Sequence, residues 1–589
     1  MKDHSVMGGL FSSFLLINSG THKTELKLQA CITATLQVLV VFLINLRCLS
    51  AIFGFYYALN AGAWGWQDSA RFSTRINQLV LNEDPGVSGA LLINPDRVAE
   101  VYTEIGPQML WIKNPFELNV AGSKVIDILH QANTMGLLGQ DYDHELIEKH
   151  WDATRATEAH AIDLELLLTD RLLLLSQHVK NGKVNAISLE ANWQIDEGLA
   201  SHFIDWLESV RNQELDPNNW LKPLEPRQRA YQLLKAELSR VQSDVRYVSS
   251  PVSLNKTLKI QDRDDEVATV RRLLNQFNYL DQDSGETLFD ADMQKALMKF
   301  QVDHSLAADG IAGPDTRLSL RQLVHGDPES IRVNMERWRW MPESFGESYI
   351  TVNIANFNLN YYFNSRLAFN MKTIVGKNYR KTPIFSGDMR YFVINPSWSV
   401  PHAIASKDLL PKIQKDSNYL RDMNMQVYRG WGEAQRLIDP ETIDWSALNS
   451  KNFPYHLRQL PGEKNALGKV KFMFPNEHDV YLHDTNDNSL FAKSQRAFSS
   501  GCIRLEKPIE LLMLIAQNHA GLSEAQVRVM LDSKQEKTVL MQTRLPVHIQ
   551  YWTTWIDEDN RIHYRSDIYQ RDAAIIEALS AKPPSGLPL

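Results

Sequence analysis

The sequence predicts a multidomain α+β protein in which a mainly helical first half precedes a β-rich second half. The chain has 589 residues, and because one domain typically has about 100–200 residues, three or four units are expected. Apolar residues recur three and four apart between about residues 68 and 250, which is the spacing of helices with one buried face. Short alternating runs such as residues 350–354 follow after about residue 330, which is typical of strands.

An apolar N-terminal segment, residues 1–67, predicts export. Residues 28–46 carry no charge and follow two lysines, as in an uncleaved signal anchor. In a second interpretation, residues 48–59 are the apolar core of a signal peptide with a cleavage site at residues 61–63. Both interpretations place the rest of the chain outside the cytoplasm, and only the first leaves an inner-membrane anchor at about residues 28–60.

Two helical units are expected next. Residues 68–250 form a mainly helical scaffold, and residues 251–325 form a compact unit of three helices. In the smaller unit, the acidic residues 264–266 suit the positive N-terminal end of a helix. Residues 309–310 (Asp-Gly) predict a turn before a third helix at about residues 316–323.

The β-rich part is expected at residues 326–545. Its strand pattern is interrupted at about residues 403–460 by a charged, partly helical segment, which we interpret as an inserted lid because a loop of this length is unusual. The remainder, residues 546–589, is expected to be a hairpin that turns at residues 557–560, followed by a tail.

Charge and cysteine content narrow the possible functions. The net charge of −8 gives no support to a nucleic-acid partner, which usually requires a basic surplus. The three cysteines are Cys31, Cys48 and Cys502, so no intramolecular disulfide is possible beyond residue 48. A single thiol in an exported chain is a candidate nucleophile, and its alternative role is that of a small core residue.

Two short segments carry the predicted chemistry, VYLHDT at residues 480–485 and SSGCIRL at residues 499–505. A thiol attacks acyl carbons as its thiolate, so Cys502 needs a base, and His483 can supply one. A backbone carbonyl or Asp484 could orient the other ring nitrogen of that histidine.

The residues around the thiol suit acyl transfer. Arg504 adds positive charge near Cys502. The N–H groups of Gly501 and Cys502 are candidates for an oxyanion hole. Ser499 and Ser500 are small polar residues next to this candidate oxyanion hole.

SSGCIRL resembles the signature of the L,D-transpeptidases with a YkuD-type catalytic domain, although Ser500 stands where many members have histidine. RWRWMP (337–342), NPSWSVP (395–401), PGEKNALGKVKF (461–472) and YLHDT (481–485) are similar to the large periplasmic subfamily of Gram-negative bacteria. That subfamily joins a helical scaffold, a peptidoglycan-binding module and a catalytic domain with an inserted capping subdomain. The three-helix unit itself resembles the peptidoglycan-binding domain. The shared features are the Phe-Gln dipeptide, the DGIAG turn and the threonine after it.

The resemblance implies a cysteine acyltransferase that forms 3→3 cross-links in peptidoglycan through a thioester on Cys502, without metal or cofactor, and that carbapenems acylate. It implies the periplasm as location and stem peptides as partners, with other wall-synthesis enzymes as further candidates. Substrate contact is expected from Tyr481, Trp398, Ser499 and Arg504. The alternatives are that the two aromatic residues belong to the core and that the arginine pairs with an acid.

Three other functions remain open. A peptidoglycan L,D-carboxypeptidase or amidase would use the same residues with water as acceptor. A non-catalytic wall-binding scaffold would need no thiol, and the intact motifs argue against it. A papain-type protease is disfavoured because its partner pattern is missing from the sequence.

Overall fold

The computed structural model describes residues 70–583 except for 82–85, 88–89, 115–116, 143–146, 148–156, 187–190, 193–219, 244–251, 305 and 431. The predicted signal anchor or signal peptide at residues 1–67 lies outside the described residues. Within the described part, the structure contains no helix with both the length and the apolar character needed to cross a membrane.

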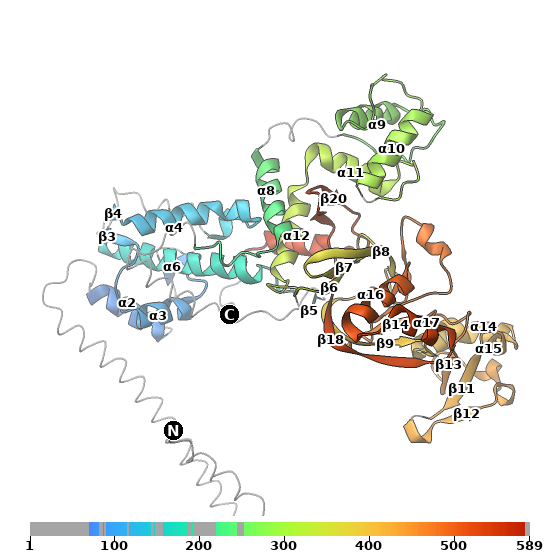
Figure 1. Ribbon diagram of the computed structural model, residues 1–589. Coiled ribbons are helices and arrows are strands. Elements are labelled where there is room, and N and C mark those ends of the chain that lie inside the picture. The colour runs from blue at the N-terminus through green and yellow to red at the C-terminus, as the bar shows by residue number, and fades with distance from the viewer. Residues whose placement is uncertain are drawn as a thin grey trace, which may run out of the picture.

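The scaffold unit is a helical layer at the N-terminal end of the described chain (Figure 1). Its helices are α2 (Ala70–Val80), α3 (Pro95–Glu104), α4 (Val120–His130) and α6 (Glu158–Asn181), with 3₁₀ turns η2 (Gln131–Met135) and η3 (Gly139–Tyr142). Two short hairpins accompany them, β1 (Gly86–Val87) with β2 (Ala90–Leu91) and β3 (Ile112–Asn114) with β4 (Glu117–Leu118). The α6 helix is buried over most of its length, as its leucine-rich sequence predicts.

The three-helix unit has its own hydrophobic core. Its helices are α9 (Asp265–Gln276), α10 (Ala291–Asp303) and α11 (Pro314–His325). Asp264 and Asp290 cap the first two helices by accepting hydrogen bonds from backbone N–H groups of the first turn. The helices α8 (Arg229–Ser243) and α12 (Pro328–Arg339) pack together outside this core and lie between the scaffold helices and the sheet in Figure 1.

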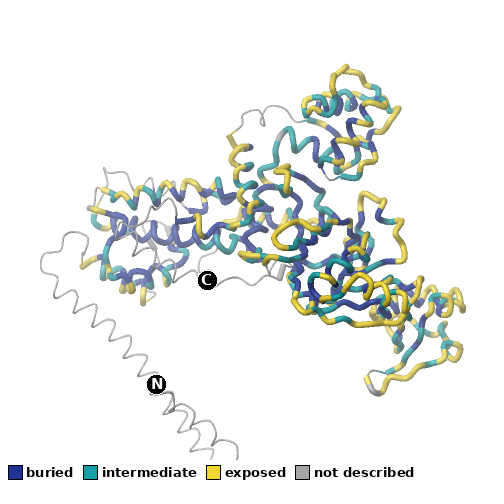
Figure 2. Tube along the Cα trace, in the orientation of Figure 1, coloured by how far each residue is buried: buried dark blue, intermediate teal, exposed yellow. Residues whose placement is uncertain are grey.

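The β-rich half is built on one large sheet. Among the described residues it has ten strands in the order β14-β15-β17-β8-β7-β6-β18-β9-β5, with β16 beside β8, and the additional β9–β14 pairing closes this order on itself. The strands are β5 (Ala191–Asn192), β6 (Tyr349–Asn353), β7 (Asn358–Phe363), β8 (Arg366–Gly376), β9 (Ile384–Ile394), β14 (Val470–Met473), β15 (Leu482–His483), β16 (Ala497–Ser499), β17 (Ile503–Leu505) and β18 (Lys537–Gln550). Helices α16 (Pro508–Ala520) and α17 (Glu524–Asp532) connect β17 to β18, and Figure 2 shows that the buried segments of this half lie in the sheet and the helix against it.

This sheet extends past two of the expected domain boundaries. Residues 191–192, placed by sequence in the scaffold, pair in parallel with β9. The β18 strand runs through the expected boundary at residue 545, because its last residues, Val547–Gln550, pair with β6 while the strand also pairs with β9. The catalytic sheet thus includes chain from both sides of the predicted domain.

The inserted segment is a subdomain with strands as well as helices. Its sheet has the order β10-β13-β11-β12, formed by β10 (Trp398–Ser399), β11 (Met425–Arg429), β12 (Arg436–Ile438) and β13 (Tyr455–Gln459). Its helical elements are α13 (His402–Ile404), the π-helical η8 (Ala405–Leu409), α14 (Leu410–Lys415), α15 (Tyr419–Asp422) and the 3₁₀ turns η9 (Gly432–Ala434), η10 (Pro440–Thr442) and η11 (Trp445–Ala447). It has its own apolar core. The subdomain therefore begins at Trp398, before the predicted residue 403.

The C-terminal segment contains the predicted hairpin. Strands β19 (Thr554–Ile556) and β20 (Ile562–Tyr564) are antiparallel, and the turn is closed by the Asp557 N–H donating to the Arg561 carbonyl. A final helix, α18 (Asp572–Ser580), follows and contacts α12.

Candidate active site

The two predicted catalytic segments form neighbouring parallel strands. In the β15–β17 pair, Leu482 is opposite Ile503 and His483 is opposite Arg504. Leu482 and Ile503 are buried in the sheet core. Because successive side chains of a strand point to opposite faces, His483 and Arg504 lie together on the other face. The antiparallel neighbour β14 adds Lys471 to that row, directly opposite His483.

Cys502 lies one position before β17, in the next row of the same face. The N–H of Ile503 donates to the Tyr481 carbonyl at 3.1 Å, which places Cys502 beside Tyr481. The Tyr481 and His483 rings are 5.6 Å apart between centroids. Tyr481 and His483 are two residues apart on one strand and so share a face. The structure therefore brings the thiol, the imidazole and the tyrosine to one patch of the sheet.

The orientation of the His483 ring is set by a backbone carbonyl. Its Nδ1 lies 2.5 Å from the carbonyl oxygen of Asp484. A carbonyl only accepts, so Nδ1 carries the proton and donates, which leaves the lone pair on Nε2. Of the two orienting groups that the sequence left open, the carbonyl is the one found.

The Asp484 carboxylate holds the backbone that orients this ring. It accepts from the backbone N–H of Lys469 at 2.7 Å and of Thr485 at 2.6 Å. Gly468 makes room for it, since a Cβ at that residue would lie 2.2 Å from the carboxylate.

His483 is a neutral base in this environment. Its pKa is lowered from 6.5 to about 3, first by burial and then by the positive charge of Arg504, with a smaller effect of Lys471. The hydrogen bond to Asp484 acts in the opposite direction and does not compensate. The imidazole is therefore unprotonated at neutral pH, and the same lowering of its pKa weakens its affinity for a proton.

Cys502 rests as a thiol. Burial raises its pKa above the ordinary value, and the lowering effects of Tyr481 and Arg504 are smaller. The thiol donates to the Asp479 carbonyl at 3.8 Å, and Asp479 has a left-handed backbone with φ of 53°. The resting pair of thiol and imidazole is thus neutral, and the thiolate must form during the reaction.

The hydrogen bonds of residues 499–502, the nucleophile loop, change part of the predicted oxyanion hole. The N–H of Gly501 already donates to Ser499 Oγ at 3.1 Å, and Ser499 Oγ donates to the Cys502 carbonyl at 2.5 Å. Gly501 has φ of 120°, a conformation that favours glycine. Ser499 and Gly501 therefore shape the loop in this conformation, and the Cys502 N–H remains the candidate donor to an oxyanion.

The inserted subdomain reaches this loop at two points. Arg380 Nη1 donates to Ser500 Oγ at 2.9 Å and pairs with Asp408 of the insertion at 2.6 Å. Trp398, the first residue of the insertion's sheet, interacts with the Tyr481 side chain, whose pKa is raised by burial and by the adjacent Cys502. Both predicted aromatic residues are partly exposed, and Tyr481 lies beside the thiol.

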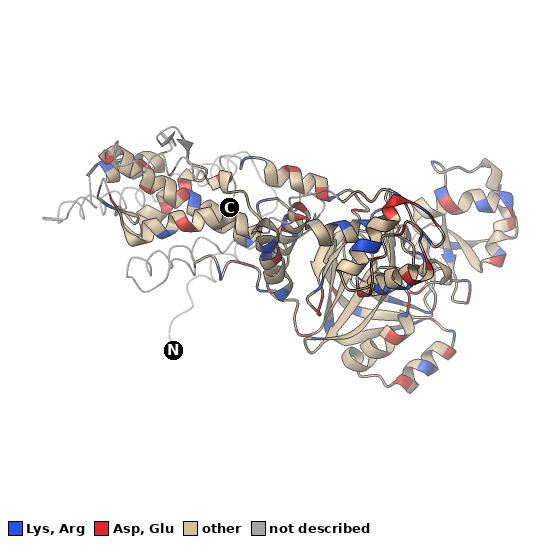
Figure 3. Cartoon of the chain, turned by 90° about the horizontal axis from the view of Figure 1, so that it is seen from above, with Lys and Arg blue, Asp and Glu red and all other residues tan. Residues whose placement is uncertain are grey.

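Two cations at the site form no close ion pair. Among the described residues, no carboxylate lies within ion-pair distance of Lys471 or Arg504, and Glu536 and Asp487 act on them only from farther away. Elsewhere, residues of both signs are interspersed along the chain (Figure 3). The buried Arg504 Nε also lacks a hydrogen-bond partner in the described part. The alternative that Arg504 pairs with an acid is thus not found. Such unpaired cations suit an anionic ligand.

Several residues at the site escaped the sequence analysis. They are Lys471, Asp479, Arg380 and Thr382. Lys471 lies inside a segment that resembles the family, but its place opposite His483 depends on strand pairing that no local pattern reveals.

Comparison with known proteins concerns the part of the chain that holds this site. Residues 347–529 match the family model described as "L,D-transpeptidase catalytic domain" (YkuD). The chain therefore contains a YkuD-type L,D-transpeptidase catalytic domain. Residues 96–238 match a "Scaffold domain" and residues 263–320 a "Putative peptidoglycan binding domain", so this catalytic domain is accompanied by both helical units.

Named relatives also carry L,D-transpeptidase titles. The chain is 34% identical over 276 residues to a "Putative L,D-transpeptidase" of Haemophilus influenzae, a match that covers 46% of this chain and 55% of the relative. The chain thus spans about half the length of the curated relative that it matches.

Solved structures of L,D-transpeptidases were also matched. Similarity to the one from Mycobacterium smegmatis has 12% identity and a TM-score of 0.17, covering 35% of this chain and 58% of that one. Similarity to the one from Stackebrandtia nassauensis has 11% identity and a TM-score of 0.20, covering 50% of this chain and 97% of that one. These TM-scores are low, so the identification of the catalytic domain rests on the sequence-family matches.

Proposed function

We propose that this protein forms 3→3 cross-links in peptidoglycan by acyl transfer through Cys502. The observation that carries the proposal is the shared sheet face of Cys502 and His483, where the imidazole keeps its Nε2 lone pair because Nδ1 is bound to the Asp484 carbonyl. A nucleophile next to an oriented base is the arrangement that covalent acyl transfer requires.

The reaction divides into two acyl transfers. Cys502 loses its proton to His483 Nε2 as Sγ attacks the carbonyl between the third residue of a tetrapeptide stem, a diamino acid, and the terminal D-Ala. The C–N bond breaks, the imidazolium returns the proton to the amine of D-Ala, and a thioester remains. The side-chain amine of a diamino acid on a second stem then attacks the thioester, its proton passes through His483 to Sγ, and the new amide leaves. The old amide bond supplies the driving force, so no nucleotide is consumed.

The charges at the site support this proposal. Both reacting groups are neutral at rest, so the developing thiolate gains from Arg504, whose charge already acts on the thiol. Stem peptides carry carboxylates, and we assign Lys471 and Arg504 to their recognition because no carboxylate of the described chain lies within ion-pair distance of these cations. Tyr481 and Trp398 would line the same path.

The accompanying units support a place in the cell wall. The match of residues 263–320 to a peptidoglycan-binding model fits attachment to the polymer that the catalytic domain would modify. We infer a periplasmic location, with other wall-synthesis enzymes as candidate partners of the scaffold unit.

Mass spectrometry tests the proposal. The full chain and its Cys502→Ala variant are incubated with a disaccharide-tetrapeptide. A tripeptide–tetrapeptide dimer formed only by the unsubstituted protein is expected, together with a covalent carbapenem adduct on Cys502. Tripeptide without dimer would replace the proposal by an L,D-carboxypeptidase. No product and no adduct would overturn the enzymatic function and favour a wall-binding scaffold.

A further inference from the structure

The loop that precedes β9 lies beside the nucleophile loop and is closed by two buried hydroxyl groups. It spans residues 376–382 and connects β8 to β9. The Lys377 N–H donates to the Ser499 carbonyl at 3.0 Å, so the loop is bound to the strand that leads to Cys502. Anything that fixes this loop also fixes the backbone around the thiol.

The first hydroxyl belongs to Thr382, which is fully buried. Its Oγ1 accepts from the Gly376 N–H at 2.9 Å and donates to the Gly501 carbonyl at 2.8 Å. A hydroxyl has one proton, so the direction of this relay is fixed. Thr382 therefore ties the loop to the residue immediately before Cys502.

The second hydroxyl belongs to Tyr569, whose side chain is 1% exposed. Its hydroxyl donates to the Gly376 carbonyl and accepts from the Thr382 N–H, the latter at 3.2 Å. It thus joins the first and last residues of the loop. A Cβ at Gly376 would lie 2.1 Å from the Arg380 carbonyl, which shows how closely the loop is folded.

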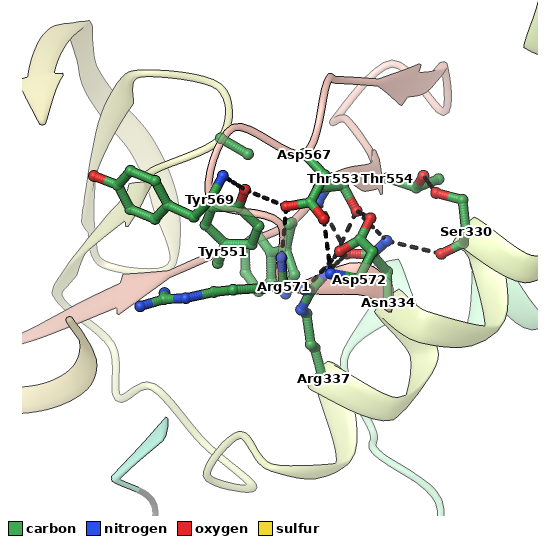
Figure 4. Close-up of polar contacts among 12 residues, drawn as sticks. Ser330, Asn334, Arg337, Tyr551, Thr553, Thr554, Asp567, Tyr569, Arg571 and Asp572 are labelled. Carbon is green, nitrogen blue, oxygen red and sulfur yellow. Dashed lines mark hydrogen bonds and ion pairs between the residues drawn. The ribbon is translucent and has the colours of Figure 1, made fainter. Parts of the chain in front are cut away.

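Tyr569 is itself held by a buried polar network of the C-terminal segment (Figure 4). Its N–H donates to the Tyr551 hydroxyl at 2.8 Å, and the two rings stack with centroids 5.6 Å apart. The Tyr551 hydroxyl donates to Asp567 at 2.5 Å, and Asp567 also accepts from the Asp572 N–H at 2.8 Å. Arg571 lies over both rings, 5.3 Å from each centroid.

This network is anchored on the α12 helix. Asp572 pairs with Arg337 at 2.7 Å and accepts from Thr553 Oγ1 at 2.8 Å. Asn334 accepts from the Thr553 N–H at 3.1 Å. The Tyr569 side chain is therefore connected to α12 through side chains that are buried or partly buried.

We propose that Tyr569 and Thr382 are positioning residues for the reaction at Cys502, supplied in part by a C-terminal segment outside residues 347–529. Neither hydroxyl touches substrate. Together they fix the Gly501 carbonyl, and with it the plane of the Gly501–Cys502 peptide whose N–H is the candidate oxyanion donor. Displacement of a reacting group by about 1 Å can lower a rate by about 100-fold. This inference rests on the proposed function of Cys502.

The test uses Tyr569→Phe in the full chain, with Tyr362→Phe as matched control. Tyr362 also bonds the sheet to the C-terminal segment, through Glu558 at 3.1 Å, but does not contact the loop. We expect Tyr569→Phe to lower kcat for D-Ala release about 10- to 100-fold with KM within about twofold, and Tyr362→Phe to leave both unchanged. Equal loss of kcat in the control, or full activity of Tyr569→Phe, would overturn the inference.

A second pair of variants separates positioning from folding. Thr382→Val removes the relay with little change in shape, and Thr382→Ser keeps the hydroxyl. We expect Thr382→Val to lower kcat as Tyr569→Phe does, and Thr382→Ser to keep most of the kcat of the unsubstituted protein. The melting temperatures of both variants should lie close to that of the unsubstituted protein. Similar kcat values for the two would contradict the proposal. If the unsubstituted protein itself releases no D-Ala and its Cys502 is not alkylated by iodoacetamide, the proposed function fails, and the positioning role fails with it.

Discussion

Lys471 of β14 and His483 of β15 lie directly opposite each other, and Arg504 of β17 continues the row on the far side of the histidine. The histidine is thus flanked by two cations in neighbouring strands. Burial and, to a smaller extent, these cations keep the base uncharged, and the arrangement leaves two positive groups for an anionic ligand. The same cations therefore act on the base and on the ligand, so a change to one cation alters both the pKa of His483 and the binding of an anionic ligand.

Replacement of Lys471 tests its assignment to carboxylate recognition. Lys471→Gln should raise the KM for the tetrapeptide donor about tenfold, the equivalent of about 1.4 kcal/mol of lost binding. The pKa of His483 should rise, since Lys471 contributes to lowering it. Steady-state kinetics of D-Ala release measure the first effect. Lys415→Gln, at an exposed residue of α14, is the control, and an unchanged KM in Lys471→Gln would refute the assignment.

The pH dependence of thiol reactivity follows from the raised pKa of Cys502. Its pKa lies above the ordinary 9.0 because burial disfavours the thiolate. The thiolate fraction should therefore increase about tenfold per pH unit between pH 7 and 9. Alkylation by iodoacetamide, followed by mass spectrometry on the peptide that contains Cys502, should rise accordingly. A rate that levels off below pH 8 would instead indicate a stable thiolate–imidazolium pair.

Gly468 provides the space that the Asp484 carboxylate needs to hold the backbone whose carbonyl orients His483. A Cβ there would meet Asp484 at 2.2 Å, so Gly468→Ala should displace Asp484 and lower kcat at least tenfold. Gly432→Ala is a matched control, because both glycines have φ of 57° but Gly432 has nothing within 4 Å of the added Cβ. Both variants should lose about 1 kcal/mol from the left-handed backbone. A normal kcat in Gly468→Ala would show that Asp484 does not orient the histidine.

Glu165 is the main polar anchor inside the scaffold unit. Its buried carboxyl accepts from the backbone N–H groups of Leu110, Trp111 and Ile112 and from the Tyr102 hydroxyl. Glu165→Ala leaves these donors buried without an acceptor, at a cost of about 3 kcal/mol or more. Thermal or urea unfolding measures the loss, with exposed Glu104→Ala as control.

The titration of Glu165 adds a pH signature to that test. Burial raises its pKa from 4.5 to about 7. A group whose pKa is higher in the folded state than in the unfolded state stabilises the folded protein at pH values below the unfolded-state pKa. That stabilisation is lost as the pH rises toward the folded-state pKa of about 7. The destabilisation by Glu165→Ala should therefore be larger at pH 5 than at pH 8. The opposite order would show that the carboxyl is ionised in the folded protein.

Local signals predict those parts of the fold that depend on neighbouring residues. Asp264 caps α9 because acidic side chains suit the first turn, and the hairpin turns where residues 557–560 favour a turn. The catalytic segments are also recognisable from sequence, because His483 and Cys502 each lie in a short motif of distinctive composition. Their placement on neighbouring strands agrees with the chemistry expected of them.

Long-range pairing accounts for what the sequence did not predict. The two residues of β5 are too few to show periodicity, and they form a strand only because β9 offers an edge. In β18 the first half is exposed and the second half is buried, so no single alternation marks it as one strand. Lys471 has the pattern of a solvent-facing residue, and Tyr569 is 67 positions from Cys502 along the chain. Such contacts exist only after the sheet has formed.

The position of β18 has a consequence for the order of events during synthesis. This strand lies between β6 and β9, yet it is the last strand of the sheet to leave the ribosome. Until about residue 550 has emerged, β6 and β9 each lack a neighbour, and the ring of strands stays open. Non-local pairing of this kind delays folding and keeps strand edges available. A growing chain should therefore stay unfolded in its catalytic half almost to its end, a state in which a polypeptide can still be threaded through a narrow pore.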